Sequence, residues 1–350
     1  MPPTTTTTTP KTTTTKPIGY IGLGNAGYSL ASNLPKAGYN LIVHDSDAAK
    51  TSQAAREWPN TTAADPDPTK LPSAFSDCEI IITMLPQGKI VRQVLLGDGG
   101  PSASGLAQTL SPGTIIIDTS SSSPFDTRAL GQELAALPNA PILVDAPITQ
   151  TYMHATDAGE STFMVGCDSE EVYATVERVL RTMGAYIFHM GGLGAGHAMK
   201  TLNNYVMASS ICALADSLVT GQKFGLEPRK MVDVLNVGTG VCFPTLDTFR
   251  RDGLTRRFDS GFGLGLLVKD LGITEEFMEE AGFRTGLPAM LRGYLQDGLD
   301  RVDPAADHTA CLVGWEERSG VRLEKTEDVK DIPREDFEHR LKGLNRPRRS

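Results

Sequence analysis

Lys200 and Asn204 are four residues apart, a spacing that places two side chains on one face of a helix. The same face continues with apolar residues, at Met207, Ile211, Leu214 and Leu218. A lysine at the head of an apolar stripe is partly desolvated, so we expect its pKa to fall towards neutral pH, which suits proton transfer. From the spacing alone, the alternative is a lysine whose ammonium group reaches solvent past the stripe.

A glycine-rich turn near the N-terminus matches the pattern G-x-G-x-x-G and consists of Gly22, Leu23, Gly24, Asn25, Ala26 and Gly27. In a turn of this kind, Gly22 allows the tight bend, Gly24 lets the backbone approach a pyrophosphate, and Gly27 lets the next helix pack closely on a sheet. Anionic oxygens then meet the N-terminus of that helix. The turn predicts a dinucleotide-binding site, and a generic turn is the alternative for the glycines alone.

Asp45 ends the next apolar run along the chain. A carboxylate at this place accepts a hydrogen bond from the ribose 2′-hydroxyl of NAD and repels the 2′-phosphate of NADP. Ser46 offers no guanidinium group to hold such a phosphate. We therefore expect NAD rather than NADP, with a solvated carboxylate at a strand end as the alternative for Asp45.

Short apolar runs bounded by Gly, Asp or Pro alternate with helical stretches in the first half of the chain. The runs suit parallel strands buried on both faces and cover 18–22, 40–44, 79–85, 114–118 and 142–145. Helical spacing lies between them, as over 25–36 and 125–136. This alternation predicts an α/β fold with a Rossmann-type doubly wound parallel sheet.

After about residue 191 only helical patterns continue, over 193–224, 228–237, 264–281, 289–299 and 307–318. We therefore expect an NAD-binding Rossmann domain over 17–190 and an all-helical domain for substrate binding and oligomerisation over 191–320. Residues 1–16 are rich in Thr and have no apolar residue after Met1, so we expect a disordered tail. Residues 321–350 are expected to form a charged C-terminal tail.

Charge and hydropathy exclude several classes of partner. Lys and Arg total 33 and Asp and Glu total 42, a net charge of −9, which makes the chain a poor general ligand for nucleic acid or an anionic membrane. The longest mostly apolar stretch, 205–219, is shorter than the roughly 20 residues that a spanning helix needs. We expect neither nucleic acid nor a membrane as a partner.

The five cysteines lie far apart, without the spacing of a metal site, at Cys78, Cys167, Cys212, Cys242 and Cys311. We therefore expect no metal and reduced thiols, which favour a reducing compartment, the cytoplasm. The hydroxyl-rich, acid-free N-terminus keeps the mitochondrial matrix as the alternative, although it lacks the arginines of a transit peptide.

Five sequence blocks occur in the order known from one enzyme family. They are 18–39 with the glycine turn, Asp118-Thr-Ser-Ser-Ser-Ser-Pro124, Asp145-Ala-Pro-Ile-Thr149, a G-x-G-x-x-x-K-x-x-N-N block over 192–204, and 262–271 with Lys269-Asp270-Leu271. Together the blocks resemble the β-hydroxyacid dehydrogenases. The resemblance implies hydride transfer between nicotinamide and a small 3-hydroxy acid.

The resemblance also implies roles for single residues. Lys200 would exchange the proton of the substrate hydroxyl, and Asn204 would hold the hydroxyl or the carboxylate. Loop residues implied at the substrate are Ser120, Thr149, Gln150 and Thr151. Besides the glycine turn and Asp45, the residues implied at the cofactor are Leu85, Pro86, Ser121 and Lys269. Relatives form dimers or tetramers, so a homodimer or homotetramer is expected.

The chain departs from the family pattern after Ile148, where Thr149-Gln150-Thr151 replaces S-G-G. Side chains there replace glycines whose backbone amides close around a small carboxylate, so we expect a reshaped pocket and a larger or more polar substrate. Two alternatives stay open. One is an imine or carbonyl reductase of related fold, which tends to lack the lysine matched by Lys200. The other is a non-catalytic dinucleotide-binding sensor or scaffold.

Overall fold

The computed structural model describes residues 16–97, 105–149 and 159–324. The chain divides into two compact units, Met1–Lys200 (unit 1) and Thr201–Ser350 (unit 2), and the division falls inside helix α9 (Ala195–Phe224). Gln150 and Thr151, nearly all of the Thr-rich segment and nearly all of the charged tail lie outside the described residues.

Unit 1 is built on one sheet with the strand order β3-β2-β1-β4-β5-β6-β8-β7 and with β9 beside β8. The pairs from β3 to β6 are parallel, β8 runs antiparallel to β6 and β7, and β9 is parallel to β8. The strands are β1 (Ile18–Ile21), β2 (Leu41–His44), β3 (Thr61–Ala63), β4 (Ile80–Thr83), β5 (Ile115–Asp118), β6 (Ile142–Asp145), β7 (Ile148–Thr149), β8 (Ser161–Gly166) and β9 (Gly184–Gly191). The order reverses between β1 and β4, which makes the carboxyl edge there the expected ligand site.

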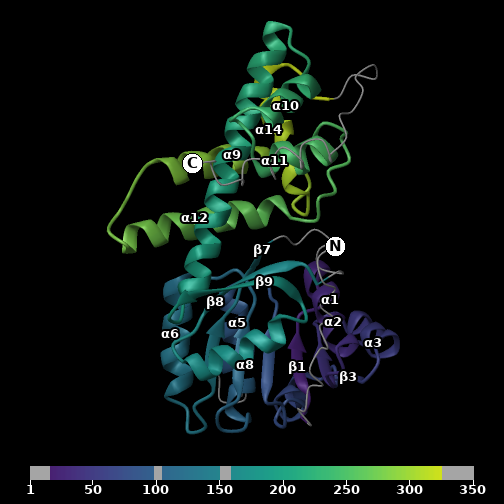
Figure 1. Ribbon diagram of the computed structural model, residues 1–350, viewed down its shortest axis with the longest axis vertical. Coiled ribbons are helices and arrows are strands. Elements are labelled where there is room, and N and C mark those ends of the chain that lie inside the picture. The colour runs from purple at the N-terminus through teal and green to yellow at the C-terminus, as the bar shows by residue number, and fades with distance from the viewer. Residues whose placement is uncertain (1–15, 98–104, 150–158, 325–350) are drawn as a thin grey trace, which may run out of the picture. The chain divides into compact units, whose positions relative to one another are not determined.

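Helices on both faces of this sheet confirm the doubly wound α/β fold (Figure 1). They are α1 (Asn25–Ala31), α2 (Asn33–Lys36), α3 (Ala48–Glu57), α4 (Leu71–Ala74), α5 (Gly88–Leu96), α6 (Pro124–Ala135) and α8 (Glu170–Leu180), with short 3-10 turns at Pro68–Lys70 and Leu106–Gln108. Three helices begin where a side chain accepts a backbone N–H of the first turn, at Asp47, Ser123 and Ser169.

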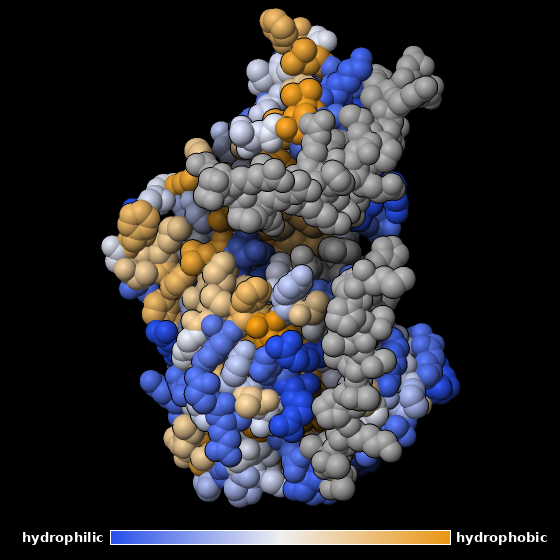
Figure 2. Space-filling view, viewed as in Figure 1, coloured by the Kyte–Doolittle hydropathy of each residue, from blue (hydrophilic) through white to orange (hydrophobic). Residues whose placement is uncertain are grey.

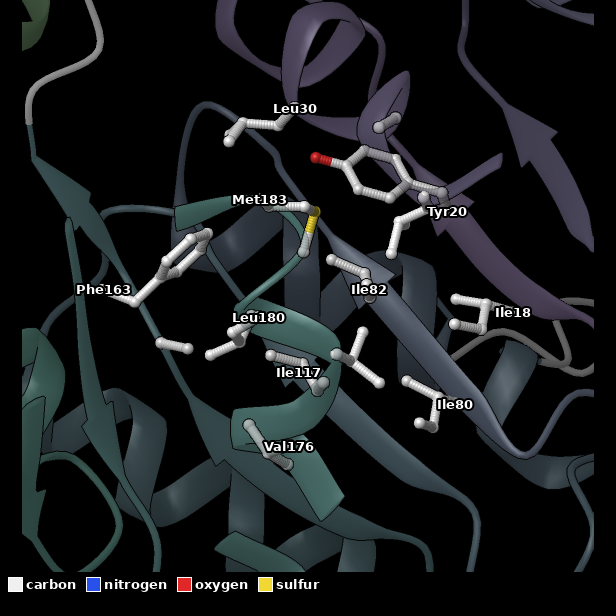
Figure 3. Packing of buried hydrophobic residues seen from close by; sticks show 14 of the residues in the cluster. Ile18, Tyr20, Leu30, Ile80, Ile82, Ile117, Phe163, Val176, Leu180 and Met183 are labelled. Atoms are coloured by element: carbon white, nitrogen blue, oxygen red, sulfur yellow. The ribbon is translucent and has the colours of Figure 1, made fainter. Parts of the chain in front are cut away.

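The core explains why consecutive residues of each strand are apolar, instead of apolar and polar residues in alternation. Ile80 and Ile82 point to the face covered by α1 and α8, where Tyr20, Leu180 and Met183 pack against them (Figure 3). The intervening Ile81 points to the opposite face, covered by α5 and α6. Because both faces are buried, each large apolar residue of such a strand contributes about 2 kcal/mol of hydrophobic stabilisation.

The five strands expected from the sequence are confirmed, each within two residues of the expected ends. The helical stretch expected over 25–36 is confirmed, but it is divided at Ser32 into α1 and α2. Pro35 has no N–H to donate to the carbonyl of Ala31, so the helical ladder cannot continue through this point.

Unit 2 is helical, which confirms the expected all-α C-terminal part. Beyond α9 it contains α10 (Pro228–Val237), α11 (Phe243–Leu246), a π-helical turn at Phe249–Gly253, α12 (Leu264–Glu280), α13 (Leu287–Leu299), a 3-10 turn at His308–Cys311 and α14 (Leu312–Ser319). The stripe that follows Asn204 lies in the core of this unit, with Ile211, Leu214 and Leu218 packed among α12, α13 and α14. Trp315 closes this core, and its Nε1–H donates to Asp216 at 2.7 Å.

Unit 2 also exposes large apolar side chains, some of which appear in orange on its helices in Figure 2. The most exposed are Phe224, Phe283, Val234 and Val206. Among the residues that the structure describes, no helix combines the length and the hydropathy required to cross a membrane.

Candidate active site

The glycine turn after β1 has the geometry that a pyrophosphate site requires. Gly22 has φ of 105°, and a Cβ on it would lie 2.2 Å from the carbonyl oxygen of Met84. A Cβ on Gly27 would lie 2.2 Å from the carbonyl oxygen of Gly22, whereas a Cβ on Gly24 would meet no atom within 4 Å. Packing within the protein therefore requires the first and third glycines. The open space beside Gly24 is what the backbone needs to approach a ligand.

The helix that follows this turn leaves its first N–H groups available. Gly24 is the N-cap of α1, no side chain caps the helix, and no acidic residue lies in its first turn. Such N–H groups favour an anion. The residues of the turn thus fit the pyrophosphate of a dinucleotide.

Asp45 is held against the glycine turn by hydrogen bonds. Its Oδ2 accepts the backbone N–H of Leu23 at 2.6 Å, and its Oδ1 accepts that of Asp47 at 2.8 Å. The carboxylate is partly buried and Ser46 is exposed. A carboxylate offers about four acceptor positions, so this one keeps capacity for a ribose hydroxyl.

The ends of β4 and β5 are joined by the serine loop, residues 119–123. Ser120 Oγ accepts the backbone N–H of Leu85 at 2.9 Å. Asp118 Oδ1 accepts the Thr83 hydroxyl at 2.9 Å and the backbone N–H of Ser120 at 3.0 Å. The structure therefore brings together Leu85 and Ser120, which sequence analysis expected at the cofactor and at the substrate, respectively. Ser120 is buried, Ser121 is partly buried and Pro86 is exposed.

Two further residues at this edge were missed by sequence analysis as site residues, Asp145 and His197. Asp145 ends β6, and its Oδ1 and Oδ2 accept the backbone N–H groups of Gly194 and His197, each at 2.7 Å. The His197 ring lies between the Thr127 hydroxyl at 2.7 Å and the Ser120 carbonyl at 3.1 Å. The sequence signal for Asp145 was its place at a strand end, directly before a loop expected at the substrate.

The charge on Asp145 is buried, and this affects its titration. Burial raises the pKa of its carboxyl group, while the nearby His197 and the two backbone N–H groups act in the opposite direction. The ring nitrogens of His197 lie 3.8 Å from oxygens of Asp118 and Asp145. His197, Asp118 and Asp145 thus form a buried cluster next to the start of α9.

The other expected residues of unit 1 are placed as follows. Thr149 is partly buried at the end of β7 and pairs with Thr162 of β8. Lys200 is partly buried on α9, five residues after the start of that helix. Gln150 and Thr151 fall outside the described residues.

In unit 2, one buried carboxylate joins two of the expected residues. Asp270 Oδ2 accepts the side-chain amide of Asn204 at 2.5 Å, and Asp270 Oδ1 lies 3.0 Å from Lys269 Nζ. The carbonyl oxygen of the Asn204 side chain accepts the amide of Asn203 at 3.1 Å. Asp270 was known from the sequence only as part of a motif, and within unit 2 it contacts two residues that sequence analysis expected at the substrate and at the cofactor.

Comparison with known proteins identifies the family of the chain. The family model described as the NAD-binding domain of 6-phosphogluconate dehydrogenase matches residues 17–192. A second model, described as NAD-binding of NADP-dependent 3-hydroxyisobutyrate dehydrogenase, matches residues 194–314. The chain belongs to the β-hydroxyacid dehydrogenase family. As a β-hydroxyacid dehydrogenase it is an NAD(P)-dependent oxidoreductase that acts on CH–OH groups.

Individual relatives of this β-hydroxyacid dehydrogenase cover most of its length. It is 32% identical over 310 residues to 2-(hydroxymethyl)glutarate dehydrogenase of Eubacterium barkeri, covering 87% of this chain and 97% of the relative. It is 32% identical over 269 residues to mitochondrial 3-hydroxyisobutyrate dehydrogenase of Homo sapiens, covering 74% and 75%. A solved structure of 3-hydroxyisobutyrate dehydrogenase of Mycobacterium tuberculosis with L-serine is 26% identical, with a TM-score of 0.71 over 85% of this chain and 98% of that chain.

Within residues 16–97, 105–149 and 159–324, no group of three or more His, Cys, Asp or Glu side chains is arranged to hold a metal ion.

Proposed function

We propose that this dehydrogenase interconverts a small 3-hydroxy acid and its carbonyl product with NAD, and that Lys200 exchanges the proton of the substrate hydroxyl. The observation that carries the proposal is the position of Lys200 on α9, partly buried and just past a helix start that the buried Asp145 fixes. A partly buried amine on a helix with a fixed origin is suited to proton transfer.

The nicotinamide ring, when bound, supplies the hydride chemistry. The protein supplies the proton transfer and the orientation. In oxidation, the neutral amine of Lys200 accepts the hydroxyl proton, and in reduction its ammonium group donates one. Asn204 orients the substrate. The donors near Thr149, Gln150 and Thr151, together with Ser120, bind the substrate carboxylate. Positioning of this kind can lower a barrier by several kcal/mol.

NAD is proposed over NADP because of Asp45. Its carboxylate is fixed on the glycine turn by the Leu23 N–H, so it is held close to where a ribose next to that turn would lie. A phosphate on the ribose would meet that negative charge without a compensating guanidinium from the exposed Ser46. The residues proposed to hold the remainder of the cofactor are Leu85, Pro86, Ser121 and Lys269.

The names of the relatives guide the choice of substrate. 3-Hydroxyisobutyrate, 2-(hydroxymethyl)glutarate and L-serine, the molecules in those names, all carry a hydroxymethyl group on the carbon next to a carboxylate. We propose the same arrangement here. Thr149, Gln150 and Thr151 stand where the family has small residues, which favours an acid larger or more polar than 3-hydroxyisobutyrate.

An absorbance assay of NAD and NADP reduction tests this function. The panel contains the three hydroxymethyl acids above, simple 2-hydroxy acids, and, in the reverse direction, aldehyde acids and cyclic imines. We expect the highest kcat/KM with a 3-hydroxy acid and NAD. Turnover confined to imines, or NAD binding without turnover on any member, would contradict the proposal.

We further propose a homodimer or homotetramer in a reducing compartment. The exposed apolar side chains of unit 2 support an oligomer, because soluble chains rarely leave many such residues in water.

All five cysteines are free thiols, and four of them are buried, which supports a reducing compartment such as the cytoplasm. The human relative is named as mitochondrial, so the matrix is the alternative. Light scattering and localisation of a tagged chain test these points.

A further inference from the structure

The start of α9 is fixed by a single buried carboxylate. Both oxygens of Asp145 are engaged by backbone N–H groups, those of Gly194 and His197. Asp145 has no exposed surface. Hydrogen bonds to a charged acceptor are shorter and stronger than those between neutral groups, so they define the position and the tilt of the first turn.

The His197 ring connects that turn to the serine loop. The carbonyl oxygen of Ser120 can only accept, so the Nε2 of His197 carries the proton and donates to it at 3.1 Å. The Nδ1 lies 2.7 Å from the Thr127 hydroxyl, at the first turn of α6. The ring is fully buried. Any displacement of the first turn of α9 is therefore transmitted to the loop between β5 and α6.

Close backbone contacts leave this helix start little freedom. A Cβ on Gly196 would lie 2.1 Å from the carbonyl oxygen of Met164 and 2.9 Å from Asp145 Oδ2. A Cβ on Gly166 would lie 2.2 Å from Asp145 Oδ1. Glycines on β8 and on α9 thus allow the carboxylate to lie between the two elements.

We propose that Asp145 and His197 are positioning residues for Lys200, an inference that rests on the proton-transfer role proposed above. Lys200 follows His197 by three residues, less than one helical turn of about 3.6 residues. Asp145 therefore fixes the part of α9 from which Lys200 projects. The hydrogen bond from His197 to Ser120 holds the serine loop next to the first turn of α9. That loop is proposed to contact the substrate and the cofactor.

Three substitutions that change side-chain volume little separate the contribution of Asp145 from that of His197. In Asp145→Asn, one oxygen becomes an NH2 group that faces a backbone N–H, so one of the two bonds is lost. In His197→Gln, the amide nitrogen can take the place of Nε2 and keep the bond to Ser120. In His197→Asn, the shorter amide can keep the contact with Thr127 only. Asp307→Asn in unit 2, where the carboxylate accepts the backbone N–H groups of Gly261 and Thr309, is the control for loss of a buried carboxylate.

The readouts are kcat, KM, the Kd for NAD and hydrogen exchange measured by mass spectrometry. We expect Asp145→Asn and His197→Asn to lower kcat by about tenfold to hundredfold, because small displacements of a catalytic group have effects of this size. His197→Gln should stay within about threefold of the wild type, and Asp307→Asn within about twofold, even though it melts earlier. KM and Kd should change less than kcat in Asp145→Asn.

Hydrogen exchange gives a readout that is independent of turnover. In Asp145→Asn, the peptide 192–200 should exchange faster than in the wild type. In His197→Asn, the peptide 118–124 should exchange faster, and His197→Gln should restore its protection. Protection unchanged in all three variants, or kcat within about twofold of the wild type in Asp145→Asn and His197→Asn, overturns the inference.

Lys200→Met distinguishes this failure from failure of the proposed function. If Lys200→Met is inactive while Asp145→Asn and His197→Asn are normal, only the positioning role is wrong. If Lys200→Met itself turns over normally, both the proton-transfer role and the positioning role are wrong.

Discussion

The side-chain amide of Asn204 donates to Asp270 at 2.5 Å, inside unit 2. This bond sets the orientation of the Asn204 side-chain amide. A carboxylate can only accept hydrogen bonds, so the NH2 group of Asn204 must face Asp270. The same carboxylate lies 3.0 Å from Lys269 Nζ. Asp270 thus orients one residue proposed at the substrate and another proposed at the cofactor.

Asp270→Asn is expected to lower kcat by about tenfold or more, because a neutral amide lets the Asn204 side chain rotate and frees Lys269 from its ion pair. Steady-state kinetics with a saturating hydroxy acid measure the effect. Asp216→Asn is the matched control, since its remaining oxygen can still accept the Trp315 N–H. A kcat within about twofold of the wild type in Asp270→Asn would mean that Asn204 needs no orientation by Asp270.

The cofactor preference should change with Asp45 and Ser46. In the double substitution Asp45→Asn with Ser46→Arg, the amide oxygen still accepts the Leu23 N–H, while the guanidinium can bind a 2′-phosphate. We expect the ratio of kcat/KM for NADP to that for NAD to rise by about tenfold or more. Ser46→Arg alone is the control and should change the ratio less. An unchanged ratio in the double variant would show that Asp45 does not interact with the ribose.

The same methyl group should affect stability at one glycine of the turn and NAD affinity at another. In Gly27→Ala the new Cβ meets the Gly22 carbonyl at 2.2 Å, so we expect a loss of about 1–3 kcal/mol in the free energy of unfolding. In Gly24→Ala the methyl enters open space, so stability should change by less than about 1 kcal/mol while the Kd for NAD rises about tenfold. Thermal denaturation and fluorescence titration measure both quantities. Normal NAD affinity in Gly24→Ala would show that no ligand approaches there.

Acid should destabilise unit 2 through His308. Burial lowers the pKa of His308 below its usual 6.5, against the opposing effect of Asp307 and Asp252, while Arg251 lowers it further. The unfolded chain therefore binds a proton before the folded one as the pH falls, so stability present above about pH 6.5 is lost below it. The loss is up to about 1.4 kcal/mol per pH unit until the folded pKa is reached.

Melting temperatures between pH 7.5 and 5.5 check this prediction. His308→Asn keeps a polar atom near the Ser260 hydroxyl, which lies 2.9 Å from Nδ1, and removes the titrating group. Its melting temperature should depend less on pH than that of the wild type. An equal dependence in both proteins would assign the acid effect to other groups.

The strands that carry the site were predictable because their signal is local. The runs ending at Asp118 and Asp145 are apolar on consecutive residues, as buried parallel strands require. β9 was not predicted, because its run contains aromatic residues and His189 in place of consecutive Ile, Val and Leu, and most of its side chains are exposed. The break between α1 and α2 depends on one missing N–H, at Pro35, within a stretch of good helical spacing.

The candidate site was predictable only where residue types form a motif along the chain. Gly22, Gly24, Gly27 and Lys200 belong to such motifs. The bonds from Asp145 to α9 join residues 49 and 52 positions apart, and Ser120 meets His197 across 77 positions. These contacts follow from the order of the strands in the sheet, which spacing along the sequence does not reveal.

Lys200→Met removes the amine that is proposed to exchange the substrate proton, while the methionine side chain keeps a similar length. Turnover of the best hydroxy acid should fall by about a thousandfold or more, with the Kd for NAD within about threefold of the wild type. A kcat close to that of the wild type, with NAD still bound, would show that the amine of Lys200 does not exchange the substrate proton.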